Sequence, residues 1–182
     1  GPSLPLWRQQ VSGSREGLDV LADAGVKLGI VSNADGSIEE QLRVNEICQV
    51  GEGLGVPVLA IIDSTVVGVS KPAREIFTHA LEPLGVQAEN AIYVGDTVRY
   101  DVSGARAAGL TPVHFDPLAL CTHEDHAHVA AGAAREPGVL CLAALAAGQH
   151  GALDRVPASR ERLLEAAHED AVVGLGVPRV HL

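Results

Sequence analysis

Short apolar runs alternate with amphipathic segments along the first two-thirds of the chain. The runs have the length of strands and are apolar nearly throughout, which is typical of strands buried on both faces of a parallel sheet. They cover residues 26–31, 56–62, 91–94 and 111–115. The segments around them carry apolar residues at helical spacing, and several end at a glycine. They predict helices over residues 16–24, 37–44, 73–84 and 99–108.

This alternation predicts an α/β protein with right-handed parallel crossovers and helices on both faces of one sheet. We therefore predict a Rossmann-like, three-layer α/β/α fold with a mainly parallel sheet. The core domain is predicted over residues 15–130, after a lead-in or cap remnant at residues 1–14. Residues 131–182 are predicted to form a C-terminal helical extension, with helical patches at residues 140–145 and 159–167.

Composition and net charge restrict the kinds of partner that the protein is expected to bind. Of the 182 residues, 47% are hydrophobic but only 3% are aromatic, so the core must be filled by many small side chains. The net charge of −10 argues against nucleic acid and anionic membranes as partners, because both need a basic surface. No apolar run approaches the roughly 18 to 20 residues of a membrane span. Three widely spaced cysteines, Cys48, Cys121 and Cys141, are typical of reduced thiols, and we expect a cytoplasmic protein.

Candidate chemistry is concentrated in AIYVGDTVRYDVSGARAAGL, residues 91–110. An apolar strand ends here at Asp96, and Asp101 follows before a predicted helix. Sites in open parallel sheets form at the carboxyl ends of strands, so both carboxylates are expected to face one crevice. Two carboxylates suit Mg²⁺, which takes oxygen ligands and is often completed by a substrate phosphate. The alternative is that Asp96 caps the helix and Asp101 is a solvated surface acid.

Two further stretches bear on this choice. VKLGIVSNADG, residues 26–36, is a strand that ends at Ser32-Asn33, and VSKPAREIF, residues 69–77, places Lys71 just before a predicted helix. A hydroxyl after one strand, a lysine at a helix start and an acidic pair after a later strand resemble, in that order, the second, third and fourth motifs of the haloacid dehalogenase superfamily. The resemblance covers roughly residues 15–130.

The resemblance implies a role for each of these residues in a phosphatase. Asp96 would bind Mg²⁺, with Asp101 helping directly or through water. Ser32, with the backbone amide of Asn33, would hydrogen-bond a phosphoryl oxygen, and Lys71 would neutralise charge at the reacting group; Lys71 and Ser32 are thus the implied catalytic residues. The substrate would be a small phosphorylated molecule. A metal-free dehalogenase is the other enzymatic branch, but the acidic pair favours the phosphatase branch.

The first motif of the superfamily, DxDx[TV], is absent from this sequence. It supplies the nucleophilic Asp, so we expect little or no phosphatase activity from this chain alone. A non-catalytic binding module or subunit of the same fold is the alternative. The chain contains no Met and begins Gly1-Pro2, which favours a shortened N-terminus over natural loss of the motif.

Loss of the first motif also removes a strand. In the resembled fold that strand lies between the strand ending at Ser32 and the strand before Asp96, and a gap there would leave buried backbone groups unpaired. The two flanking strands could pair directly, residues 4–11 could insert, or a strand could come from outside the chain. We expect the last, from an N-terminal fragment or from another copy in a homo-oligomer, because residues 4–11 contain Pro5 and three consecutive polar residues.

Two other motifs offer weaker chemistry. THEDHAH, residues 122–128, carries His123, Asp125, His126 and His128, which could ligate zinc. A polar loop before a helix is the favoured interpretation, because no matching ligand pair stands nearby. GEGLG, residues 51–55, lacks the GxGxxG spacing of a dinucleotide site and is predicted to be a turn.

Overall fold

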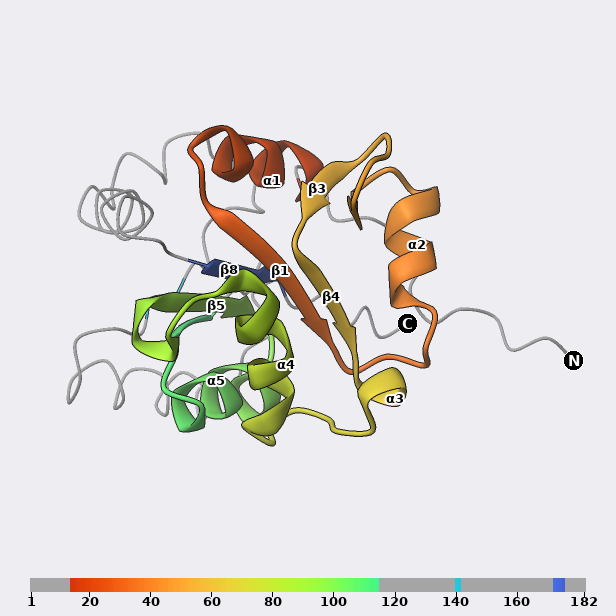
Figure 1. The fold of residues 1–182 in the computed structure, drawn as a ribbon. Coiled ribbons are helices and arrows are strands. Elements are labelled where there is room, and N and C mark those ends of the chain that lie inside the picture. The colour runs from red at the N-terminus through yellow and green to blue at the C-terminus, as the bar shows by residue number, and fades with distance from the viewer. Residues whose placement is uncertain (1–13, 115–139, 142–171, 176–182) are drawn as a thin grey trace, which may run out of the picture.

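The structure is a computed structural model that describes residues 14–114, 140–141 and 172–175 (Figure 1). The strands are β1 (Lys27–Ser32), β2 (Cys48–Val50), β3 (Val56–Val58), β4 (Ala60–Asp63), β5 (Ala91–Gly95), β6 (Thr111–His114), β7 (Leu140–Cys141) and β8 (Val172–Leu175). The α-helices are α1 (Ser14–Asp23), α2 (Ile38–Val44), α3 (Ser64–Val67), α4 (Glu75–Leu84) and α5 (Ser103–Ala107). A 3₁₀ turn, Ala88–Asn90, precedes β5, and a π-helical turn, Val98–Val102, precedes α5.

A six-stranded parallel sheet organises the fold, with the order β4-β1-β8-β5-β6-β7. Strands β2 and β3 form a separate two-stranded parallel sheet. Helices and parallel strands alternate along residues 14–114, so the predicted α/β fold is confirmed. Figure 1 shows β4, β1, β8 and β5 side by side, with α1 and α4 lying against them.

Strand β8 occupies the position that we predicted would be filled from outside the chain. It pairs with β1 from Lys27↔Val172 to Ile30↔Leu175 and with β5 from Ala91↔Val172 to Val94↔Leu175. A strand lies between β1 and β5 as expected, but the prediction of its source was wrong, because it comes from the C-terminal part of the same chain. Pairing on both edges satisfies backbone groups that would be costly to bury unpaired.

The C-terminal part of the chain differs from prediction in a second place. Leu140 and Cys141 were predicted to begin a helix but form β7, which pairs with β6 at the edge of the main sheet. Two short segments of the predicted helical extension are therefore strands of the core sheet. Whether a segment forms a strand depends on what it pairs with, and a pairing partner more than 25 residues away cannot be recognised from the local sequence. Three further predictions lie outside the described residues: the helix at residues 159–167, the histidine-rich motif at residues 122–128 and most of the lead-in at residues 1–14.

Smaller differences lie near β4. The single strand predicted over residues 56–62 is divided into β3 and β4, which belong to different sheets. The segment after Asp63, between a predicted strand and a predicted helix, contains the short helix α3. The GEGLG segment is a bend folded against Gln49, whose side chain accepts a hydrogen bond from the Gly55 amide at 2.8 Å and donates one to the Gly55 carbonyl at 3.1 Å.

Alternation along the strands divides the core between the two faces of the sheet. In β1, Leu28 and Ile30 pack in one cluster with Leu18 of α1, whereas Val31 packs in the other. In β5, Ile92 and Val94 join the first cluster, whereas Tyr93 joins the second. Successive strand side chains point to opposite faces, so each continuous apolar run serves two layers.

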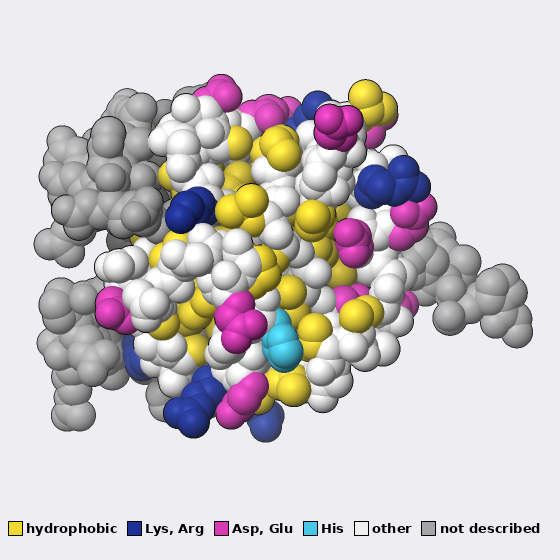
Figure 2. Space-filling model, in the orientation of Figure 1, with side chains coloured by type: hydrophobic (Ala, Val, Ile, Leu, Met, Phe, Trp, Pro, Cys, Tyr) yellow, Lys and Arg dark blue, Asp and Glu magenta, His cyan; other side chains and the backbone are white. Residues whose placement is uncertain are grey.

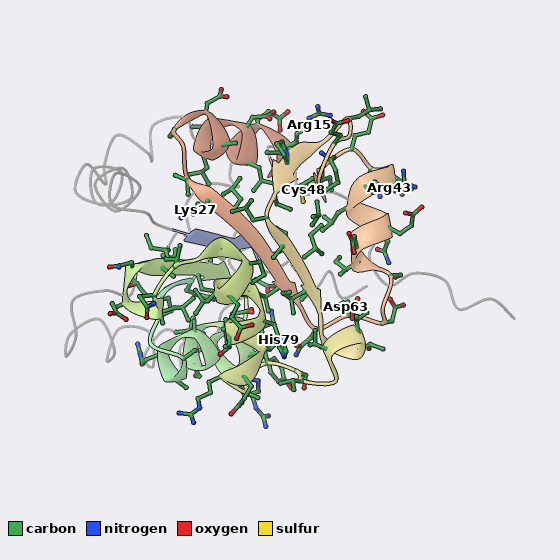
Figure 3. All side chains as sticks on the ribbon, viewed as in Figure 1. Arg15, Lys27, Arg43, Cys48, Asp63 and His79 are labelled. Carbon is green, nitrogen blue, oxygen red and sulfur yellow. The ribbon has the colours of Figure 1, made fainter. Side chains whose placement is uncertain are left out.

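Helix α4 covers the second face. Its buried positions repeat at helical spacing: Ile76, Phe77, Ala80 and Leu84. His79 points outward from the same helix, as Figure 3 shows. On the face of the molecule in Figure 2, acidic and basic side chains are interspersed rather than gathered by sign. Within the described residues, no helix is both long and apolar enough to cross a membrane.

Candidate active site

The candidate site lies where β1 and β5 end. Ser32 is the last residue of β1 and is buried, and Asn33 follows it. Asp96 directly follows β5 and is half-buried. Because β8 separates the two strands, their ends are about two strand spacings apart, roughly 10 Å. Lys71 reaches this region from the segment between α3 and α4.

Asn33 holds the backbone of Lys71. Its side-chain amide donates to the Lys71 carbonyl at 3.0 Å, and its side-chain oxygen accepts from the Lys71 amide at 2.8 Å. This two-point contact joins residues 38 positions apart in the sequence. The resemblance assigned a phosphoryl contact to the Asn33 backbone amide; the structure adds an anchoring role for the Asn33 side chain.

The side chain of Lys71 forms a buried ion pair. Its Nζ lies 2.5 Å from Oδ1 of Asp101, and it donates to the Tyr93 hydroxyl at 2.9 Å. The Lys71 side chain is 6% exposed and that of Asp101 is 2% exposed. Buried charges are tolerated when they are paired and hydrogen-bonded; here the two charges pair with each other, and both oxygens of Asp101 accept further hydrogen bonds.

The π-helical turn after β5 carries Asp101 into this position. Thr97 donates to Oδ2 of Asp101 through its backbone amide at 2.9 Å and its hydroxyl at 2.5 Å. The Asp101 side chain also packs directly on Gly95, where an added Cβ would overlap Cβ and Cγ of Asp101. The glycine ending β5 is therefore required by close approach of the carboxylate.

The environment fixes the charge states of the cluster. Burial alone would raise the pKa of Asp101, but the charge of Lys71 and hydrogen bonds from Lys71 and Thr97 outweigh it and hold that pKa below its usual value. Burial, reinforced by the charge of Asp101, raises the pKa of Tyr93 well above its usual value. At neutral pH the cluster therefore contains a carboxylate and a protonated phenol.

Three polar residues of this region were missed from the sequence. Tyr93 lies inside an apolar run and Thr97 in a loop, and both contact Asp101. His114, at the end of β6, is buried, and its Nε2 donates to the Asp96 carbonyl at 3.1 Å. For Tyr93 and His114, the available signal was a polar group within an otherwise apolar strand, since a buried hydroxyl or imidazole needs a partner.

The predicted site residues are brought together only in part. Lys71, Asn33 and Asp101 form one contact network at the end of β1, and Ser32 lies in the same strand end. We predicted that Asp96 and Asp101 would face one solvent-accessible crevice, where the resemblance implied that Ser32 and Lys71 also act. That prediction was wrong for Lys71 and Asp101, which face each other in the interior. The interpretation of Asp101 as a solvated surface acid was wrong for the same reason.

The described residues do not by themselves fit a Mg²⁺ site. Both oxygens of Asp101 are engaged, one by Lys71 and Tyr93 and the other by Thr97. No group of three or more His, Cys, Asp or Glu residues within the described part of the chain is placed to hold a metal ion. Asp96 is the one predicted ligand whose carboxylate is outside the Lys71–Asp101 pair, so further ligands would have to come from elsewhere.

A second buried carboxylate lies at the same end of the sheet but serves the backbone. Asp63, at the end of β4 and the start of α3, accepts hydrogen bonds from the amides of Thr65 at 2.9 Å, Gly36 at 2.9 Å and Ile38 at 3.4 Å (Figure 3). It caps α3 and ties the loop after β1 to the loop after β4. The chemistry of Asp63 is therefore that of a structural anchor.

Comparison with known proteins agrees with this geometry. The haloacid dehalogenase-like hydrolase family matches residues 6–109, more than half of the chain. The fold and the motif residues at the strand ends thus define the class of protein: this chain belongs to the haloacid dehalogenase-like hydrolases.

Among curated relatives, the chain is 36% identical over 107 residues to ribulose-1,5-bisphosphate 5-phosphatase of Halopiger xanaduensis, covering 59% of this chain and 42% of that protein. It is 34% identical over 111 residues to glyceraldehyde 3-phosphate phosphatase of Pyrococcus abyssi, covering 60% and 43%. The chain thus spans less than half the length of these relatives. A solved HAD phosphatase from Thermococcus onnurineus has 30% sequence identity and a TM-score of 0.56, with 63% of this chain and 50% of that chain covered.

Proposed function

We propose that this chain carries the phosphoryl-binding part of a phosphate monoester hydrolase that depends on Mg²⁺. The observation that supports this best is the buried ammonium of Lys71, held at the carboxyl end of the sheet by Asp101 and Tyr93. Phosphoryl transfer requires positioning and charge stabilisation more than bond-making by protein groups. The phosphatases among the similar proteins favour the same reaction class.

Lys71 would supply positive charge to the phosphoryl group. An ammonium has three N–H donors, and its contacts with described residues use two of them, so the third would serve a phosphoryl oxygen. The low pKa of Asp101 keeps the partner carboxylate charged beside the ammonium. Ser32, at the end of β1, would donate a hydrogen bond to a second phosphoryl oxygen.

Mg²⁺, when bound, would neutralise charge on the phosphoryl group. Asp96 is the ligand that this chain would contribute. The family's nucleophilic carboxylate is expected at the end of the strand between β1 and β5. Here that strand is β8, and the sequence that follows it, GVPRVHL, contains no Asp or Glu. The attacking group and the remaining metal ligand would therefore come from residues that this sequence does not contain.

Hydrolysis of p-nitrophenyl phosphate with Mg²⁺ tests the catalytic half of the proposal. The 182-residue chain should show turnover at background level, because the covalent route through an Asp nucleophile is absent. A longer gene product that carries a DxDx[TV] segment should be active. Robust turnover by the 182-residue chain that disappears in Asp96→Ala would contradict this reading, since another residue would then be attacking.

Binding of inorganic phosphate, followed by calorimetry, tests the phosphoryl site without requiring turnover. The sequence contains only two lysines, Lys71 and Lys27, and Figure 3 shows Lys27 at the other end of β1. Lys71→Met should weaken phosphate binding about tenfold or more, as expected for loss of a charge-assisted hydrogen bond, whereas the control Lys27→Met should not. Equal affinities for the two variants would contradict the proposed role of Lys71.

A non-catalytic binding module of the same fold is the second candidate. It is favoured by the absence of a carboxylate after β8 and by the internal pairing of Lys71 with Asp101. The two candidate functions predict different results for a longer gene product. Phosphate binding without hydrolysis, in a protein that includes every residue its gene encodes, would favour the module.

A further inference from the structure

Tyr93 is buried to the same degree as the hydrophobic core, yet its hydroxyl makes three polar contacts. Its side chain is 1% exposed, and its ring packs edge-on against Phe77 with centroids 4.9 Å apart. A phenylalanine would satisfy this packing equally well. The hydroxyl lies 2.9 Å from Nζ of Lys71, 3.0 Å from the Val31 carbonyl and 3.2 Å from Oδ1 of Asp101. The hydroxyl therefore links the ion pair to β1.

The directions of these bonds follow from donor capacity. The Lys71 ammonium can only donate, so the phenol oxygen accepts from it. The single phenol proton is then directed to the Val31 carbonyl and the Asp101 carboxylate, both of which can only accept. Because burial raises the pKa of Tyr93, the phenol keeps this proton at neutral pH. The link between Lys71 and β1 is thus maintained through one hydroxyl.

Tyr93 reaches β1 by crossing β8. Tyr93 lies on β5 and Val31 on β1, and β8 runs between these strands. The register places Tyr93 level with Gly174 of β8, and Gly174 level with Gly29 of β1. Residues level with one another in a parallel sheet face the same side, so Tyr93, Gly174 and Gly29 share one face of the sheet, and the Tyr93 hydroxyl reaches β1 on that face.

We propose that Tyr93 is a positioning residue for Lys71, which fixes the ammonium relative to the end of β1. Val31 directly precedes Ser32, so the hydroxyl ties the lysine to the strand end that carries the second phosphoryl ligand. Asn33, two residues after Val31, binds the Lys71 backbone through its side chain. Lys71 is thus tied to the end of β1 at two points: its backbone is held by Asn33, and its side-chain nitrogen is linked to Val31 through the Tyr93 hydroxyl. The role in phosphoryl binding rests on the proposed function; the positioning of the ammonium does not.

Tyr93→Phe removes the hydroxyl and keeps the ring. The sequence contains only one other tyrosine, Tyr100, which lies next to Arg99 outside this cluster, so Tyr100→Phe is the matched control. Nitrogen-labelled protein should show a slowly exchanging ammonium signal, and the presence of only two lysines makes its assignment to Lys71 direct through Lys71→Met. Loss of the Tyr93 bond should speed solvent exchange of this signal about tenfold or more, and Tyr100→Phe should leave it unchanged.

Retention of wild-type exchange at Lys71 in Tyr93→Phe would overturn the proposal. If that variant does not fold, the wild-type chain decides. A nuclear Overhauser effect between the Tyr93 hydroxyl proton and the Lys71 ammonium supports the proposal, and its absence overturns it. These signals require no phosphate, so they are independent of the phosphate titration of Lys71→Met.

Discussion

Asp63 and Asp101 are both buried carboxylates at the carboxyl end of the sheet, but the protein satisfies them in different ways. Asp63, 5% exposed, accepts hydrogen bonds from three backbone amides. Asp101, 2% exposed, contacts a buried ammonium, a phenol, a hydroxyl and one backbone amide. One carboxylate is held by neutral dipoles of the backbone, and the other by a full opposite charge.

This difference in partners distinguishes Asp63, a structural anchor, from Asp101, a candidate functional group. Removing Asp63 would leave three backbone amides without their acceptor, but it would leave no charge buried without a partner. Removing the charge of Asp101 would leave the Lys71 ammonium buried without compensation. A structural carboxylate thus has neutral partners, whereas a carboxylate that sets the charge and position of another group has an ionised one.

The largest effect should come from Asp101→Asn. The substitution keeps the shape of the side chain but leaves the Lys71 charge unpaired, and breaking one side of a buried pair typically costs about 3–5 kcal/mol. Urea unfolding followed by circular dichroism measures the loss. The double variant Lys71→Met/Asp101→Leu should recover most of it, because neither charge remains. A loss for Asp101→Asn no greater than that for Asp63→Asn would contradict the contrast between the two carboxylates.

Gly95→Ala should disturb the packing of the Asp101 side chain without removing any charged group. The new methyl would overlap the Asp101 side chain, so either the carboxylate or β5 must shift. Overpacking of this kind costs roughly 1–3 kcal/mol. Gly17→Ala in α1 is a suitable control, because no atom lies within 4 Å of its added Cβ. Equal unfolding midpoints for Gly95→Ala and the wild type would show that Asp101 is not packed on Gly95.

Asp63→Ala should have a moderate effect. It removes the cap of α3 and the bonds to the loop after β1, and loss of such a cap costs about 0.5–2 kcal/mol. Urea unfolding again gives the magnitude. Phosphate affinity should stay within error of the wild type, in contrast to variants of Lys71. A large fall in phosphate affinity for Asp63→Ala would place Asp63 in the binding site rather than in the anchor.

The smallest expected effect is on the pH dependence of stability. The pKa of Asp101 is lower in the folded protein than its usual 3.8, so its ion pair contributes stability above that value, and the contribution is lost as the pH falls through the folded pKa. The stability difference between the wild type and Asp101→Asn should therefore narrow as the pH falls from about 7 to about 3. Urea unfolding at several pH values measures it. A difference that widens on acidification would contradict the assigned direction.

Local pattern predicted most of the elements between residues 14 and 114. Apolar runs become β1, β5 and β6 within one residue at most ends inside the described range, because a strand buried on both faces needs little beyond continuous apolar character. Helix α4 lies inside the range predicted for it, and the apolar residues at helical spacing are its buried positions. The motif order was sufficient to assign the superfamily, which the family match confirms.

The site was less predictable than the elements. The sequence identified four site residues from their positions after predicted strands or before a predicted helix: Ser32, Lys71, Asp96 and Asp101. The pairing of Lys71 with Asp101 and its link to Tyr93 depend on side chains 22 to 30 residues apart. Nothing in the local sequence of Tyr93 distinguishes its ring, which a core needs, from its hydroxyl, which the lysine uses.

The sequence by itself determined the alternation of strands and helices, the motif residues at strand ends and the absence of a DxDx[TV] segment. Only the tertiary structure decided that β8, and not a strand from outside, lies between β1 and β5. It also decided that Lys71 and Asp101 neutralise each other in the interior, with the Tyr93 hydroxyl between them and β1. Strand pairing and buried charge pairing are both contacts between distant segments. Their free energies depend on what the fold brings together, which local propensity does not encode.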